Sequence, residues 1–229
     1  RTVNISHLVD CTPTQNATFY LAKLCTVLAI GFTMITVSAV TAILFQLTQG
    51  EFNIQPQLYL LLYYYSGLPV MLVALLTLFL QRFAKAKAVG LLLGLAVFVL
   101  NGLTKHFLIE HPLMTFAYQP QFIFSQMADT IYHAEATHWY NLYWLSLMGV
   151  LGVLTVRYWQ RGTSQIAQQL SSQGRLALSF FFALSIGSGS YIFYQTNVFN
   201  QFNSEKQEIA LMADYEKSYR QFLDNPAPT

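Results

Sequence analysis

Five long apolar stretches set the strongest limit on how this chain can fold. An α-helix rises about 1.5 Å per residue, so roughly 20 mostly apolar residues cross the hydrocarbon core of a bilayer. The stretches cover residues 19–47, 58–80, 89–109, 139–159 and 176–194. The first is long enough to tilt or to extend past the membrane. We therefore predict an all-α fold, a polytopic transmembrane helical bundle with about five spans across residues 19–194.

The composition agrees with a lipid environment. Hydrophobic residues make up 54% of the chain and charged residues only 10%, whereas about a quarter of the residues in a soluble domain are charged. The net charge is +2 and no basic stripe with interleaved aromatic residues is present, so we expect the lipid bilayer and not nucleic acid as a partner. The two cysteines, Cys11 and Cys25, do not make a disulfide framework and are predicted to be unpaired.

Positive charges occur in alternate connections between the predicted spans. Residues 81–88 and 157–175 contain Lys and Arg, whereas residues 48–57 and 110–138 contain neither. Cytoplasmic loops of membrane proteins carry the excess of Lys and Arg. The rule predicts that residues 1–18, 81–88 and 160–175 are cytoplasmic, and that residues 48–57, 110–138 and the tail after 194 lie outside. Lys23 is expected to extend its ammonium group to the cytoplasmic face.

Two segments do not fit a membrane span. The first 16 residues mix polar and apolar positions, and we predict a short helix along the membrane surface that Pro13 ends. Within the tail at 195–229, apolar residues recur at helical spacing from Ile209 to Phe222, with Glu, Lys and Gln between them. This pattern predicts an amphipathic soluble helix in an extracytoplasmic linker.

Candidate catalytic and metal-binding groups form no complete constellation. His133, Glu135 and His138 approach the metallopeptidase pattern H-E-x-x-H, but their histidines are five residues apart. Five residues turn a helix by roughly 140°, so the two imidazoles diverge. His106 and His111 have the same spacing at the rim of the third span, and Asp129 with Glu135 is interpreted as a pair of solvated acids. We therefore expect no catalytic residue, metal or other cofactor within these 229 residues.

Small and polar residues inside the apolar stretches predict helix contacts. Small residues let helix backbones approach closely in lipid. The candidates are Gly90 with Gly94, Gly149 with Gly152, and Gly187 with Gly189. The polar residues Asn101, Asn141 and Ser146 are interpreted as partners in helix–helix hydrogen bonds, and lining of a substrate path is the alternative.

Aromatic residues cluster near the ends of the stretches. Amphipathic Trp and Tyr rings are enriched where the membrane meets water. We therefore predict an interfacial position for most of them, including Trp139, Tyr140, Tyr143 and Trp144. The run Tyr63 to Tyr65 is deeper, and we interpret it as a helix contact.

Short runs along most of the chain carry a resemblance. They are RTV at 1–3, ISHLVDCTP at 5–13, LAKL at 21–24, QLTQG at 46–50, EHPLMTF at 110–116, SQMAD at 125–129, NLYW at 141–144, RGT at 161–163, YQTNVFN at 194–200 and ADYEKSY at 213–219. Together they resemble a bacterial family in which a type-2 ABC transporter permease is fused to a gluzincin aminopeptidase domain. The chain departs from that family at Gln126, where an acid is expected.

The resemblance implies a role for the first segment. In such permeases a cytoplasmic helix fits a groove of the ATPase subunit. The residues that would carry this coupling are Arg1, Ser6, His7, Asp10, Thr12 and Pro13. A simple interfacial helix is the alternative for the same residues.

The resemblance also implies what surrounds this chain. The chain would be the later membrane part of a permease in the bacterial inner membrane, with earlier spans before Arg1 and a second permease half or a second copy as partner. The peptidase domain, with its zinc, would follow Thr229 outside the membrane. A different class of function is an anchor that only presents this peptidase.

Overall fold

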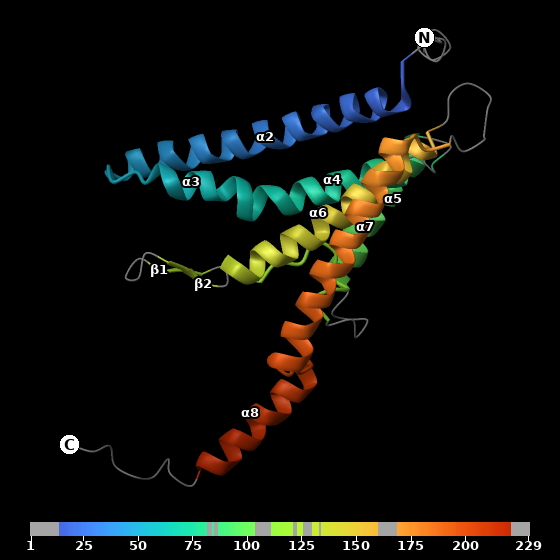
Figure 1. Ribbon diagram of the computed structural model, residues 1–229. Coiled ribbons are helices and arrows are strands. Elements are labelled where there is room, and N and C mark those ends of the chain that lie inside the picture. The colour runs from blue at the N-terminus through green and yellow to red at the C-terminus, as the bar shows by residue number, and fades with distance from the viewer. Residues whose placement is uncertain are drawn as a thin grey trace.

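The computed structural model describes residues 14–81, 84, 87–103, 111–120, 123–125, 130–132, 134–159 and 169–220. Helices dominate this part of the chain (Figure 1). In chain order the elements are α2 (Asn16–Thr48), α3 (Pro56–Leu62), the π-helix η1 (Tyr63–Gly67), α4 (Leu68–Gln81), α5 (Lys87–Leu103), strands β1 (Ile123–Ser125) and β2 (Thr130–Tyr132), α6 (Ala134–Arg157), α7 (Ser172–Phe193), the π-helix η3 (Tyr194–Phe199) and α8 (Glu205–Tyr219).

Four helices are long and apolar enough to cross a membrane, which indicates a membrane protein. They cover Asn16–Thr48, Pro56–Gln81, Ala134–Arg157 and Ser172–Phe199. They correspond to the first, second, fourth and fifth predicted spans, and each begins a few residues earlier than predicted. Hydropathy locates the apolar core of a span, whereas the helix continues past that core into the interface.

The third predicted span is only partly described. Helix α5 has 17 residues and its apolar section, Ala88–Val97, is shorter than a full span. Residues 104–110, the rest of the predicted span, lie outside the described residues. The structure therefore establishes four candidate spans, and the fifth stays a prediction.

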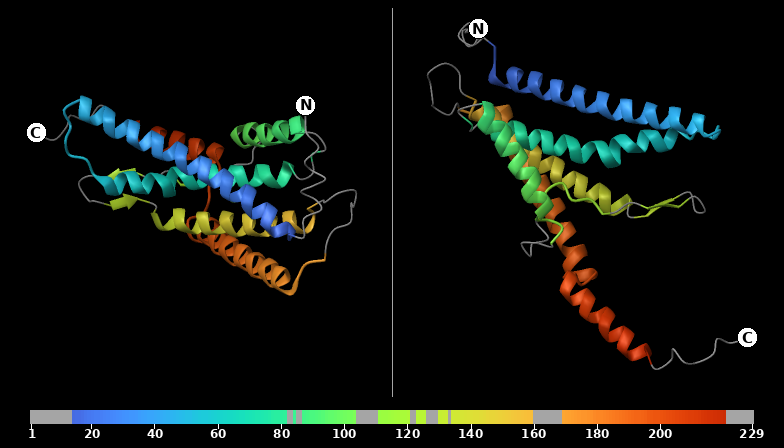
Figure 2. Two further views of the ribbon diagram at one scale, coloured as in Figure 1. Left: turned by 90° about the horizontal axis from the view of Figure 1, so that it is seen from above. Right: turned by 180° about the vertical axis from the view of Figure 1, so that it is seen from behind.

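Helices α2, α4 and α6 lie beside one another, as the two views in Figures 1 and 2 show. Helix α7 packs on α6 at an angle, and α5 packs on α4. Helix α7 continues through η3 toward α8, which projects away from the other helices (Figure 2). The bundle is therefore open on several sides.

The start of α2 is attached to the end of α6. The Asn16 side-chain amide donates a hydrogen bond to the Trp159 carbonyl oxygen at 3.3 Å. The Lys23 ammonium lies 4.6 Å from the centre of the Trp159 ring, a cation–π contact. The end of α4 and the start of α7 lie toward this same end of the bundle (Figure 1).

The all-α prediction holds for the bundle, to which a short hairpin is added. Strand β1 pairs antiparallel with β2, with Phe124 opposite Ile131, inside the segment that the sequence predicted to be a loop. The hairpin extends from the opposite end of the bundle (Figure 1). Three-residue strands are too short for the alternating pattern that reveals a strand in a sequence.

The interior forms mainly where α4, α6 and α7 meet. The buried hydrophobic cluster consists of Leu72, Tyr140, Trp144, Met148 and Ile192. Tyr140 is 6% exposed and Trp144 is 4% exposed, so neither ring faces lipid or water, and their interfacial depth stays a prediction. The reason is tertiary, because rings of the 111–120 segment cover them. Phe116 packs edge-on to Trp144 with ring centres 5.1 Å apart.

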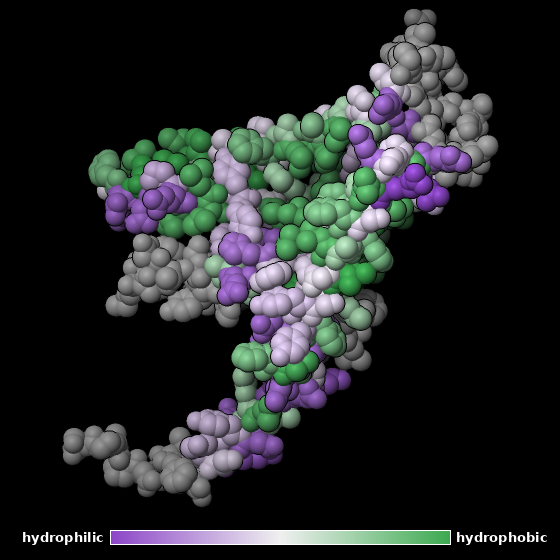
Figure 3. Space-filling view, viewed as in Figure 1, coloured by the Kyte–Doolittle hydropathy of each residue, from purple (hydrophilic) through white to green (hydrophobic). Residues whose placement is uncertain are grey.

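Much of the remaining surface is apolar. On α2 only Asn16 and Ala39 are buried, whereas Met34 and Phe45 are more than 60% exposed. Figure 3 shows hydrophobic residues over the face formed by α2, α3 and α4. Such a surface is compatible with contact to lipid and would be unusual on a soluble monomer.

Candidate functional site

The residues predicted to couple to an ATPase lie at the start of the chain. Arg1, Ser6, His7, Asp10, Thr12 and Pro13 lie outside the described residues. Helix α2 begins at Asn16, inside the predicted segment 1–18. Thr14 and Gln15 alone separate Pro13, the last of the six residues, from the helix.

Five of the six candidate glycines lie against a neighbouring residue. A Cβ atom would lie 2.9 Å from Gln81 at Gly90 and 2.8 Å from Thr77 at Gly94, in the α4–α5 contact. It would lie 2.6 Å from the Phe181 ring at Gly149, 2.8 Å from the Tyr20 hydroxyl at Gly152 and 3.0 Å from the Tyr143 ring at Gly189. Each of these glycines permits an approach that a side chain would obstruct.

Gly187 differs from the others. A Cβ atom there would meet nothing within 4 Å. Because residues two apart in a helix point in nearly opposite directions, Gly187 faces away from the contact that Gly189 makes. Gly187 therefore makes no helix contact in the described part of the chain, and its packing role stays a prediction.

The three polar candidates differ in the hydrogen bonds that the structure describes for them. Asn141 is 2% exposed, and its Oδ1 accepts a hydrogen bond from Gln119 Nε2 at 2.5 Å, which joins α6 to the 111–120 segment. Ser146 is 1% exposed, but its hydroxyl donates to the Tyr143 carbonyl of its own helix at 2.7 Å. Ser146 therefore makes no link between helices in the described chain. Asn101 lies in α5, and its side chain is outside the described residues.

Two buried donors near this point lack a partner among the described residues. They are Asn141 Nδ2 and Trp144 Nε1, both on α6. A buried donor left unsatisfied costs about 1–3 kcal/mol, so such groups call for a water, a ligand or a conformational partner.

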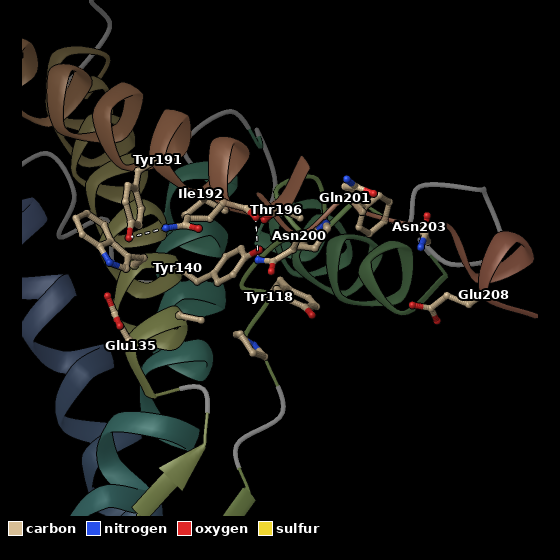
Figure 4. A pocket seen from close by; sticks show the side chains of 16 residues that line it. Tyr118, Glu135, Tyr140, Tyr191, Ile192, Thr196, Asn200, Gln201, Asn203 and Glu208 are labelled. Atoms are coloured by element: carbon tan, nitrogen blue, oxygen red, sulfur yellow. Dashed lines mark hydrogen bonds between the residues drawn. The ribbon is translucent and has the colours of Figure 1, made fainter. Parts of the chain in front are cut away.

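A pocket of about 550 Å³ lies beside these residues. Its walls come from five places: the 111–120 segment, the first turns of α6, the end of α7 with η3, the connection 200–203, and the beginning of α8 (Figure 4). Aromatic side chains line much of it, namely Tyr118, Trp139, Tyr140, Tyr191 and Phe202. Small-molecule sites usually have volumes of about 300–1,000 Å³ and such an aromatic lining.

The aromatic walls hold one another in place. Trp139 and Tyr191 have ring centres 4.2 Å apart, and Tyr118 lies 5.2 Å from Tyr140, edge to face. The Tyr191 hydroxyl accepts a hydrogen bond from Gln195 Nε2 at 3.1 Å. Burial raises the pKa of the Tyr118 phenol above its usual value, so this side chain stays a neutral hydrogen-bonding group at physiological pH.

Unusual backbone conformations occur at the pocket. In the described part of the chain, two residues other than glycine have a positive φ: Ala117 at 55° and Gln201 at 47°. Gln201 lines the pocket, and Ala117 precedes the lining residue Tyr118. The lining residues Gln195 and Thr196 belong to the π-helix η3. Strained residues and π-helical turns are both enriched at functional sites.

Histidines act as structural links near the pocket. His111 Nε2 lies 2.9 Å from Asn197 Nδ2, its Nδ1 accepts from the Leu113 amide at 3.2 Å, and its ring lies 5.4 Å from the Phe202 ring. A neutral imidazole accepts a hydrogen bond at only one of its two nitrogens. His111 therefore cannot accept hydrogen bonds from both Leu113 and Asn197. His138 Nδ1 is 2.6 Å from the Tyr64 hydroxyl, which connects α6 to η1.

No group of three potential metal ligands occurs among the residues that the structure describes. Glu135 lines the pocket, and His138 is engaged with Tyr64. His106, Asp129 and His133 lie outside the described residues. The expectation that these residues hold no metal therefore stays a prediction.

Sequence reasoning missed the pocket because its lining residues are scattered. Trp139 and Tyr140 were interpreted as interfacial rings, Gln195 was noted only within a run that carries the resemblance, and Tyr118 and Tyr191 attracted no interpretation. The one usable signal was the density of aromatic residues on both sides of the 110–138 connection. Comparison with known proteins adds no constraint, because no protein family, curated protein or solved structure matches this chain.

Proposed function

We propose that this chain is the membrane-spanning permease part of an ATP-binding-cassette export system, in which a separate subunit hydrolyses ATP. The observation that carries the proposal is the joint between the start of α2 and the end of α6. The predicted coupling segment leads directly into α2 at this joint. A displacement of residues 1–13 would therefore act on α2 at the point where it meets the rest of the bundle.

The attachment of α2 suits it to rigid-body movement. The helix has 33 residues, yet only Asn16 and Ala39 are buried. Near its start, the Tyr20 hydroxyl lies against Gly152 of α6, where a Cβ atom would be only 2.8 Å away. We propose that α2 rocks about this contact relative to the α6–α7 pair. ATP binding would favour one of the two positions by differential affinity for the ATPase-bound state.

The same proposal specifies the membrane, the orientation and the partners of the chain. It lies in the bacterial inner membrane with five spans including α5, and its Lys- and Arg-rich connections face the cytoplasm. The exposed apolar residues of α2 contact lipid or a partner permease half, which is either a homologous subunit or a second copy. Zinc belongs only to a peptidase domain beyond Thr229.

A pull-down of the full-length protein from gently solubilised membranes tests the proposal. We expect an ABC ATPase to be recovered with the unaltered protein and lost with Asp10→Arg or His7→Glu, because each change alters the charge presented to the ATPase groove. The matched control is Asp214→Arg on α8, an exposed residue whose ion pair with Lys217 at 3.8 Å contributes little to stability. Recovery of no ATPase with a folded protein, or equal losses with all three variants, would contradict the permease role.

The second candidate is a membrane anchor for an extracytoplasmic zinc aminopeptidase domain beyond Thr229. The observation in its favour is α8, which projects away from the bundle (Figure 2) and whose Ile209, Met212 and Tyr215 are all about 60% exposed. A neighbouring domain would cover these side chains. An anchor needs no ATPase, so the pull-down separates the two candidates.

A further inference from the structure

We propose that the pocket between α6, η3 and α8 binds an elongated organic cation with a protonated amine toward each end, of the polyamine type. This assignment does not require the chain to be a permease, because it rests on the lining of the pocket alone. The strongest indication is the position of two carboxylates. Glu135 and Glu208 lie at opposite ends of the row of lining side chains (Figure 4).

The described side chains that line the pocket carry only negative charge. Among the described residues that line it, Glu135 and Glu208 are acidic and none is Lys, Arg or His. In the described part of the chain, neither carboxylate has an ion-pair partner. Glu135 belongs to the first turn of α6, where the helix dipole favours a negative charge. Both carboxylates are exposed and therefore available to a ligand from solution.

Between the two acids, the lining suits a methylene chain with amines. Tyr118, Trp139, Tyr140 and Tyr191 offer apolar surface and electron-rich rings. A cation over such a ring gains about 0.5–2 kcal/mol, with the higher value for a desolvated pair. Side-chain amides of Gln195, Asn200 and Asn203 add oxygens that accept N–H groups.

The same features argue against other ligand classes. An anionic ligand would meet two carboxylates and no basic side chain among the described lining residues. A neutral apolar ligand would gain nothing from the two carboxylates or the amide oxygens of the lining. A ligand with one amine would engage only one end of the pocket. An elongated cation with an amine toward each end matches both ends and the aromatic middle at once.

Calorimetric titration of the full chain in neutral-detergent micelles, with spermine as the probe, tests this assignment. We expect spermine to bind, and Glu135→Gln and Glu208→Gln each to weaken binding about tenfold, the equivalent of about 1.4 kcal/mol. The double variant should lose more than either single one. Glu216→Gln is the matched control, because Glu216 is an exposed acid of α8 that does not line the pocket, and we expect it to leave the affinity unchanged.

A second titration uses hexylamine, which has a single amine. We expect it to bind at least about tenfold more weakly than spermine, since it pairs with one carboxylate only. Circular dichroism of each variant verifies that the helices are intact. Absence of spermine binding would overturn the assignment. So would equal losses in Glu216→Gln and the pocket variants, or equal affinities for spermine and hexylamine.

Discussion

Replacement of Leu72 by Ala is expected to destabilise the folded chain by about 2–5 kcal/mol. Leu72 is 1% exposed and packs in the cluster that includes Tyr140, Trp144 and Met148. Because this site faces protein and not lipid, acyl chains do not fill the cavity that the smaller side chain leaves. The measurement is reversible unfolding in mixed detergent micelles, followed by circular dichroism.

Leu60→Ala is the matched control for this substitution. Leu60 belongs to the same candidate span but is 68% exposed, so the change removes contacts to lipid or detergent only. We expect a cost below about 1 kcal/mol, as for most changes outside a packed interior. Similar costs at the two positions would show that α4 does not pack on α6 as the structure has it.

Replacement of Gly149 by Ala is expected to cost about 1–3 kcal/mol, the usual range for an overpacked contact. A Cβ atom at this position would lie 2.6 Å from two carbons of the Phe181 ring. An aromatic ring is rigid, so α6 and α7 would have to separate to admit the added methyl group. The thermal midpoint of unfolding in a single detergent should fall accordingly.

The chain supplies its own control for this effect. Gly187 is also a helical glycine, but a methyl group there meets nothing within 4 Å. Gly187→Ala should be neutral or stabilising by up to about 1 kcal/mol, because Ala has the higher helix propensity. Phe181→Leu in the Gly149→Ala background should restore part of the loss. Equal effects of the two glycine substitutions would contradict the α6–α7 packing.

The four candidate spans could be predicted because bilayer thickness fixes their length and composition. Their boundaries could not, since the helices continue into the interface, where hydropathy gives no signal. The small-residue pattern located five close approaches within the described chain, whereas Gly187 has no neighbour there. Spacing along one helix does not reveal which face meets a neighbour.

The pocket could not be predicted because it depends on tertiary structure. The angle between α7 and α6 and the path of the 111–120 segment bury Tyr140 and place both Tyr140 and Trp139 on the pocket wall. The two π-helices, η1 and η3, have no recognisable pattern in their sequences. The positive φ of Gln201 could not be predicted either, because residues other than glycine rarely adopt this conformation.

The movement of α2 against the α6–α7 pair is the central claim, and a distance measurement in the complete complex tests it most directly. Spin labels at Leu44→Cys on α2 and Ile186→Cys on α7 are suitable because both residues are more than half exposed. Cys11 and Cys25 are first replaced by Ser. With the ATPase bound, we predict that a non-hydrolysable ATP analogue shifts the label-to-label distance distribution by several ångströms. An identical distribution with and without the nucleotide would contradict the coupling of this chain to ATP.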